Sequence, residues 1–164
     1  MMEWEVIMMD WLDEVAKKQS EIEKSRKSAT DIGEVIKESY PNKVAELWSM
    51  FKDFYDLAKD KFDGGKVFAS RDNEMHLVIG GIEIRGFAEN IEKMGGYYGT
   101  AKVNIKYLNS NRVGNVHFDN LLLGHDNGEP TWVYRDYVNE RMTDVIFKQE
   151  DVERVFKSAF SVYL

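Results

Sequence analysis

The chain has 164 residues, of which 43% are hydrophobic and 13% aromatic, and its formal net charge is −7. This length and composition suit a folded domain and exclude a disordered or low-complexity chain. The negative charge repels phosphate backbones and anionic lipid headgroups, which argues against direct binding to nucleic acid or to a membrane. The absence of cysteine excludes disulfides, cysteine-ligated metal centres and thiol nucleophiles.

The first residues do not have the pattern of a targeting segment. Acidic residues interrupt the first apolar run, which is not the pattern of a signal peptide. No apolar stretch reaches the roughly 20 residues that a membrane-spanning helix requires. We therefore expect a cytoplasmic protein.

Residues 1–63 are predicted to be helical. Apolar residues recur from Trp4 to Val15 with the spacing of one helix face, and the mostly charged residues 17–27 extend this helix while offering little to a core. Residues 28–30 are expected to break the helix.

Two further helices are predicted before the first glycine pair. Asp31 and Glu34 fit a capping box, which would start a short helix. Pro41 disfavours helical geometry in the residue before it and suits the first turn of a new helix, so a second break is expected there. The third helix carries an apolar stripe as far as Phe62 and ends near Gly64.

Residues 64–164 are predicted to be rich in β-structure. Short apolar or alternating runs predict strands at 67–69, 75–79, 82–85, 98–108, 116–123, 131–138 and 145–147. The pair Gly80 and Gly81 predicts a two-residue hairpin turn. Residues 88–94 are expected to form one or two helical turns, and residues 151–160 a last helix.

This order of elements predicts an α+β fold, with N-terminal helices packed against a mainly antiparallel sheet of about five to seven strands, followed by a C-terminal helix. The apolar stripe of the third helix needs a cover that the sheet can supply. We therefore expect a single domain over 1–164, with a helical part at 1–63 and a β-rich part at 64–164.

A histidine and aspartate cluster is the strongest candidate for chemistry. His117 and Asp119 share one face of a predicted strand, and His125 and Asp126 follow it. Two imidazoles and two carboxylates can bind a divalent metal or act as acid and base. Their spacing matches no metal or catalytic signature, however, and turns have the same polar composition. We therefore predict no catalytic residue, no metal and no cofactor.

The N-terminal helix is the first candidate for a binding surface. The first fourteen residues place five acids and no base beside an apolar face that bears two tryptophans. The helix dipole stabilises acids at this end, which explains the charge without a function. Alternatively, such a helix docks in a groove of a basic partner protein. The residues predicted to form this binding surface are Trp4, Trp11, Glu3, Asp10, Asp13 and Glu14.

The second candidate surface is the predicted strand 131–138. Alternation places Trp132 and Tyr134 on one face and Arg135 and Tyr137 on the other. One aromatic face of a strand commonly belongs to the core, while the other can stack on a partner. Tyr134, Arg135 and Tyr137 are therefore the candidate contact residues.

The absence of a catalytic signature, the acidic charge and the aromatic helix face favour a non-enzymatic protein-binding module. It would occlude or sequester a macromolecular partner with a basic surface, as acidic phage or bacterial inhibitors and immunity proteins do. A metal-dependent hydrolase that uses the histidine and aspartate cluster, and a small-ligand sensor, are the alternatives. An N-terminal helix without a cover from its own chain also allows a homodimer.

Overall fold

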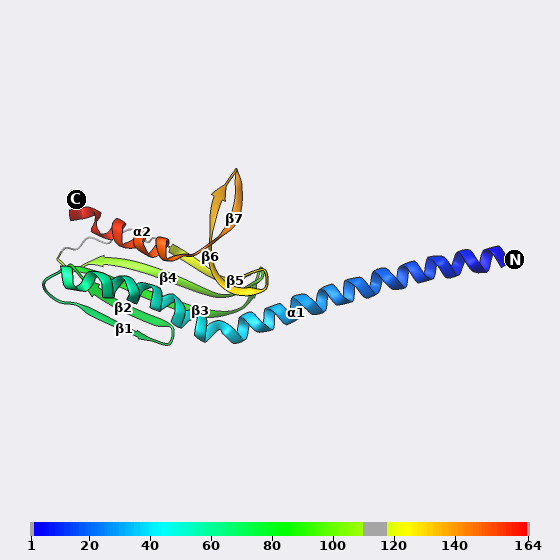
Figure 1. Cartoon of the computed structure of the whole chain (residues 1–164), viewed down its shortest axis with the longest axis horizontal. Helices are drawn as coiled ribbons and strands as arrows, with labels where there is room; N and C mark the ends of the chain where they lie inside the picture. Colours follow the sequence, from blue (N-terminus) through cyan, green and yellow to red (C-terminus); the bar gives the residue numbers. More distant parts are fainter. Residues whose placement is uncertain (1, 110–117, 164) are drawn as a thin grey trace. The chain divides into compact units, whose positions relative to one another are not determined.

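The computed structural model describes the backbone of residues 2–109 and 118–163 and, within these ranges, the side chains of residues 9–28, 31–91, 95–109 and 121–163. A long helix precedes a seven-stranded antiparallel sheet and a second helix follows it, which confirms the predicted α+β fold (Figure 1). The elements are α1 (Met2–Ala58), a 3-10 turn (Lys59–Lys61), β1 (Val67–Arg71), β2 (Glu74–Ile79), β3 (Ile82–Met94), β4 (Tyr97–Tyr107), β5 (Phe118–Asp126), β6 (Glu129–Val138), β7 (Arg141–Ile146), α2 (Gln149–Phe160) and a 3-10 turn (Ser161–Tyr163).

The chain forms two compact units, Met1–Val35 and Ile36–Leu164. The described part of the first unit is a single stretch of helix α1. The second unit contains the remainder of α1, the whole sheet and α2.

Helix α1 is continuous at both positions where a break was predicted. Residues 28–30 are helical, and Asp31 lies inside the helix instead of capping one. These predictions are wrong because Ser28, Thr30 and Asp31 have only a weak local preference against helix, which the neighbouring helical turns outweigh.

Pro41 also lies inside α1, although proline lacks the N–H that would bond to the carbonyl four residues earlier. Contacts with the sheet hold the helix on both sides of it. The Tyr40 hydroxyl donates to Asn73 Oδ1 at 2.8 Å, and Trp132 Nε1 donates to the Lys43 carbonyl oxygen at 2.8 Å. Tertiary packing therefore overrides the local preference of proline.

The strands form a meander in which each strand pairs with the next one along the chain. Two-residue turns join five of the six consecutive pairs of strands, and the connection from β4 to β5 is longer. In the turn between β2 and β3, Gly80 and Gly81 both have positive φ, at 58° and 75°, which confirms the predicted glycine hairpin. Such turns follow the right-handed twist of the strands and bring consecutive strands together in register.

Residues 88–94 continue strand β3 instead of forming the predicted helical turns. They pair with β4, for example Ala88 with Ala101 and Met94 with Tyr97. The helical prediction is wrong because it weighed only local composition, whereas pairing with β4 supplies a partner for the backbone of this segment.

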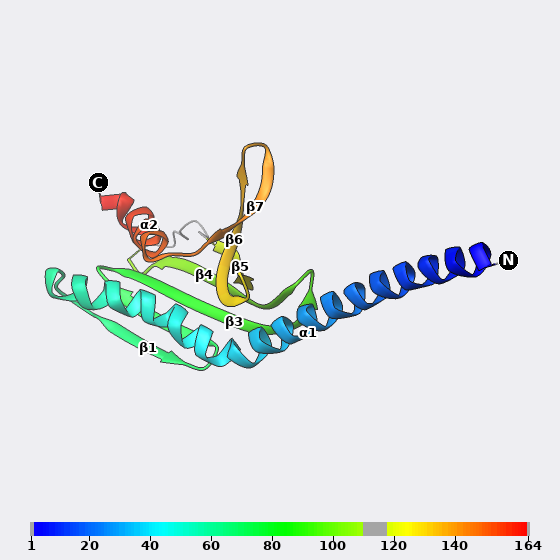
Figure 2. The ribbon, with the colours of Figure 1, turned by 45° about the vertical axis from the view of Figure 1, so that its right-hand side comes forward.

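One face of the sheet is buried under two helices. Ile82 and Ile84 of β3 and Val103 and Ile105 of β4 are fully or almost fully buried on this face. The second half of α1 and helix α2 cover it (Figure 2). The two helices meet through Phe54 and Phe156, whose ring centroids are 4.1 Å apart. The core therefore lies in a single layer between the helices and this face.

Two glycines let aromatic side chains of α1 lie directly on the strands. A Cβ atom at Gly86 would be 2.5 Å from the ring of Trp48, and one at Gly99 would be 3.0 Å from the ring of Tyr40. Both rings are buried. These contacts fix the position of the Ile36–Ala58 part of α1 on the sheet.

Candidate protein-binding surface

The hairpin formed by β6 and β7 extends beyond the other strands. β5 pairs with β6 from Glu129 to Val133, while the described pairing of β6 with β7 runs from Val133 to Val138. Figures 1 and 2 show this hairpin rising from the sheet. We refer to residues 134–146 as the hairpin arm. Because β7 is the last strand of the sheet, one of its edges has no neighbouring strand within the described residues.

The tip of the hairpin arm exposes apolar side chains. Tyr137 and Met142 are direct cross-strand neighbours, and 69% and 50% of their surfaces are exposed. Val138 is exposed on the opposite face of the ribbon, and Ile146 is exposed at its base. An exposed aromatic residue beside a flexible methionine is a common composition for the centre of a protein interface.

Polar contacts fix the base of the same face. The Tyr97 hydroxyl donates to the Asp144 carboxylate at 2.7 and 2.8 Å, and Arg135 Nε lies 3.6 Å from Asp144 Oδ1. Partial burial is the main cause that raises the pKa of Tyr97, followed by the hydrogen bond to Asp144 and the negative charge of that carboxylate. The phenol therefore stays protonated at neutral pH and ties β4 to the arm.

Tyr134 lies on the other face of β6, toward helix α2. It is half-buried, and its hydroxyl donates to Asp151 Oδ1 at 3.4 Å and accepts from Arg154 at 3.1 Å. Asp151 is buried, and it also accepts from the Lys148 backbone N–H at 2.7 Å and pairs with Arg154. Tyr134 therefore belongs to the contact between β6 and the start of α2, whereas Arg135 and Tyr137 are exposed.

A groove of about 380 Å³ lies beside the hairpin arm, between β6, β7 and α2. Its lining includes Tyr134, Lys148 and Arg154 together with three acidic residues of α2. Val145 and Ile146 also line the groove, so its surface is partly charged and partly apolar. The small-ligand alternative stays a prediction.

The face of the sheet opposite the helices carries a charged cluster that the sequence patterns did not indicate. The Glu83 carboxylate accepts from Arg85 Nε at 2.8 Å and lies 3.2 Å from His76 Nε2. The hydrogen bond from Arg85 is the main cause that lowers the pKa of Glu83. His76 and Arg85 are paired neighbours on β2 and β3, which explains why a residue of each strand reaches the same carboxylate.

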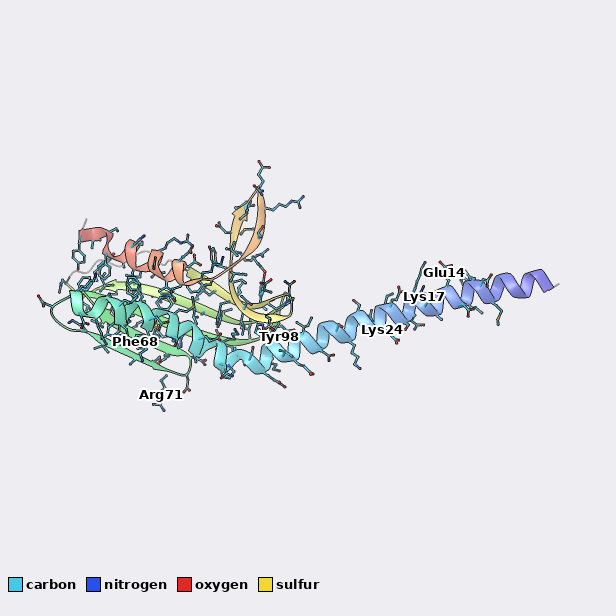
Figure 3. All side chains as sticks on the ribbon, in the orientation of Figure 1. Glu14, Lys17, Lys24, Phe68, Arg71 and Tyr98 are labelled. Atoms are coloured by element: carbon cyan, nitrogen blue, oxygen red, sulfur yellow. The ribbon has the colours of Figure 1, made fainter. Side chains whose placement is uncertain are left out.

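In the first unit, the predicted binding residues Trp11, Asp10, Asp13 and Glu14 are exposed on helix α1. Figure 3 shows the side chain of Glu14 on this helix. Glu14 pairs with Lys18 at 3.5 Å along the helix. The side chains of Glu3 and Trp4 lie outside those that the structure describes. Their proposed role stays a prediction.

The histidine and aspartate cluster is described only in part. His117 and the side chain of Asp119 lie outside the described residues, while His125 and Asp126 are exposed at the end of β5. His125 Nδ1 accepts from the Gly128 backbone N–H at 3.2 Å, which is a turn contact. Within the described part of the chain, no group of three potential metal ligands lies together.

Comparisons with protein-family models, with curated proteins and with solved structures found no match. Among the described helices, none has an apolar stretch long enough to cross a bilayer. The functional argument therefore depends on the surfaces of this chain alone.

Sequence reasoning found Tyr137 but missed Met142 and Val138 as members of an exposed patch. The signal was weak, since the sequence from Arg141 to Ile146 does not alternate strictly: the polar Asp144 stands between Met142 and Ile146 on the same face. The turn before it, Asn139–Glu140, has positive φ at both residues but contains no glycine, so it did not indicate a hairpin.

Proposed function

We propose that this chain is a non-enzymatic protein-binding module that captures a partner protein on its hairpin arm and thereby occludes or sequesters it. The observation that carries the proposal is the exposed cross-strand pair Tyr137 and Met142, at the tip of a two-stranded ribbon. Burying such a pair in a partner's cleft would remove from water apolar surface that the fold leaves exposed.

The structure of the arm suits this role in two further ways. The ribbon is held at its base by the Tyr97 and Asp144 contact, so the tip loses little conformational freedom on binding. The open edge of β7 also offers backbone N–H and C=O groups to an extended segment of the partner, as in β-strand addition. The net charge of −7 favours a partner whose cleft lies within a basic surface.

The test compares the tagged chain with the double variant Tyr137→Ser/Met142→Ser in capture from a lysate of its source organism or host, followed by affinity measurement with the purified partner. Leu57→Ser is the matched control, because Leu57 is 78% exposed and lies on α1, away from the arm. Loss of an interface anchor typically costs about 2 kcal/mol or more, which corresponds to a roughly 30-fold weaker Kd.

The proposal requires a partner that the unchanged chain and the Leu57→Ser control retain and the double variant loses. Equal capture by all three proteins would refute the hairpin arm as the binding surface. Circular dichroism of the double variant should match that of the unchanged chain, since the substituted side chains are exposed.

A further inference from the structure

The first unit carries a seven-residue apolar repeat. From residue 4 to residue 36, alternating steps of four and three residues select ten positions, of which eight are apolar and two polar. Such spacing places one stripe of side chains along a helix that pairs with another helix. The positions are Trp4, Met8, Trp11, Val15, Lys18, Ile22, Ser25, Ala29, Ile32 and Ile36.

This repeat stops where α1 begins to pack on the sheet. Continued past Ile36, the same steps would select Ser39, Lys43, Glu46 and Met50. The buried residues of the helix there are instead Tyr40, Val44, Leu47, Trp48 and Phe51. The seven-residue repeat therefore runs along the first unit and ends at Ile36, the first residue of the second unit.

The described members of the stripe from Trp11 to Ser25 are exposed, whereas Ile32 is half-buried and Ile36 is buried. Trp11 is 63% exposed, Val15 45% and Ile22 54%. A single helix cannot bury its own apolar stripe, and isolated helices gain most of their stability from packing of such a face. A surface outside this helix is needed to cover these side chains.

Charge is segregated along the same helix. Residues 1–14 contain five acids and no base, whereas residues 15–28 contain five bases and two acids. Figure 3 shows Glu14 in the first stretch and Lys17 and Lys24 in the second, all reaching outward from the ribbon. An antiparallel pair of such helices places each acidic stretch against the basic stretch of the other helix, while a parallel pair aligns like charges.

We propose that the first unit pairs with the same helix of a second copy of this chain in an antiparallel two-stranded coiled coil. The register that aligns opposite charges sets Trp11 opposite Ile22 and Val15 opposite Lys18 of the other copy. In this register the Lys18 ammonium still pairs with Glu14 of its own helix, and the methylene stem of Lys18 covers Val15 of the other copy. A parallel pair would instead set Lys18 against Lys18, with two like charges at the centre of the contact.

The orientation is testable by disulfide cross-linking, because the chain contains no cysteine. In the proposed register Ser25 lies opposite Met8 of the second copy, so Ser25→Cys mixed with Met8→Cys should form a cross-linked heterodimer. Ser25→Cys alone should not, because two copies of residue 25 would be about 17 residues apart along the axis, roughly 26 Å at 1.5 Å per residue. A disulfide requires Cα atoms within about 7 Å.

Oligomeric state provides the second readout. Sedimentation equilibrium of the unchanged chain should show a dimer, and Ile22→Glu should shift it to a monomer by placing a charge in the apolar stripe. Ser20→Glu adds the same charge outside the stripe and should leave the dimer intact. Added salt should weaken the dimer by screening opposite charges.

If the unchanged chain is a monomer, the proposal is overturned, and a groove on a different protein becomes the expected binding site for the apolar stripe. Cross-linking of Ser25→Cys with itself, or a dimer that strengthens with salt, would overturn the antiparallel arrangement in favour of a parallel one. The proposal does not depend on the hairpin arm, because the Tyr137→Ser/Met142→Ser variant leaves every residue of the stripe unchanged.

Discussion

The contact between Trp48 and Gly86 gives the sharpest test of how α1 covers the sheet. In Gly86→Ala, the new Cβ would lie 2.5 Å from Trp48 Cζ3 and 2.6 Å from Cη2. Carbon atoms in contact are normally about 3.5–4.0 Å apart, so the ring or the strand must move by about 1 Å. Trp48 is 2% exposed and its Nε1 donates to the Asp72 carbonyl oxygen at 3.2 Å, so the ring has little freedom to retreat. We expect a loss of about 1–3 kcal/mol in the free energy of unfolding.

Urea unfolding followed by circular dichroism measures this loss. For a slope of about 2 kcal/mol/M, the midpoint should fall by roughly 0.5–1.5 M with the slope unchanged. Gly65→Ala is the matched control, because a Cβ there meets no atom within 4 Å and the residue has no positive φ. Its midpoint should stay the same or rise slightly.

A double variant separates the proposed clash from other effects of the alanine. In a Trp48→Leu background, the cost of Gly86→Ala should fall by more than about 0.5 kcal/mol, because the ring that it meets is gone. An equal cost in both backgrounds, or no cost in either, would refute the placement of Trp48 on Gly86.

Two further predictions concern charged groups of the second unit. Arg85 lowers the pKa of Glu83, so the folded state gains stability from this carboxylate above the unfolded pKa of about 4.3 and loses it as the pH falls through the lower folded value. Thermal melts of Glu83→Gln should therefore show a shallower loss of stability below about pH 4.3 than melts of the unchanged chain. Parallel curves for the two proteins would contradict this. The buried Asp151 carboxylate accepts from the Lys148 N–H at the start of α2, so Asp151→Ala should cost about 1 kcal/mol, whereas the same substitution at the exposed neighbour Glu150 should change the melting temperature little.

The parts of the fold that the sequence predicted well are those in which local chemistry and packing agree. The apolar run 75–79 and the alternation of 98–108 predicted strands, and β2 and β4 are found there, each with one buried face. The turn at Gly80 and Gly81 followed from positive φ, which glycine tolerates best.

The wrong predictions fall where distant residues decide the outcome. Pro41 stays within a helix because contacts with Asn73 and Trp132 hold both of its sides. The segment 88–94 becomes strand because β4 pairs with it. No window of local sequence contains these partners.

The candidate site shows the same division. Alternation along β6 separated Tyr134 from Tyr137, and the structure places the first against α2 and the second in solvent. The sequence could not predict that the hairpin arm extends beyond the other strands. This extension depends on where the pairing between β5 and β6 ends, at Val133 among the described pairs. Pattern reasoning on one strand cannot locate the end of its pairing with another.

The two proposals use different residues and support each other physically. The exposed patch at the tip of the arm is small, and a small patch alone gives weak binding once the cost of association is subtracted. A dimer formed through the first unit would carry two arms, so that engagement of one arm raises the effective concentration of the other without any new contact. The gain would disappear in a monomeric Ile22→Glu variant while each arm kept its own affinity. Self-pairing of the first unit would thus convert a modest apolar patch into a stronger capture surface for any partner that presents its cleft more than once.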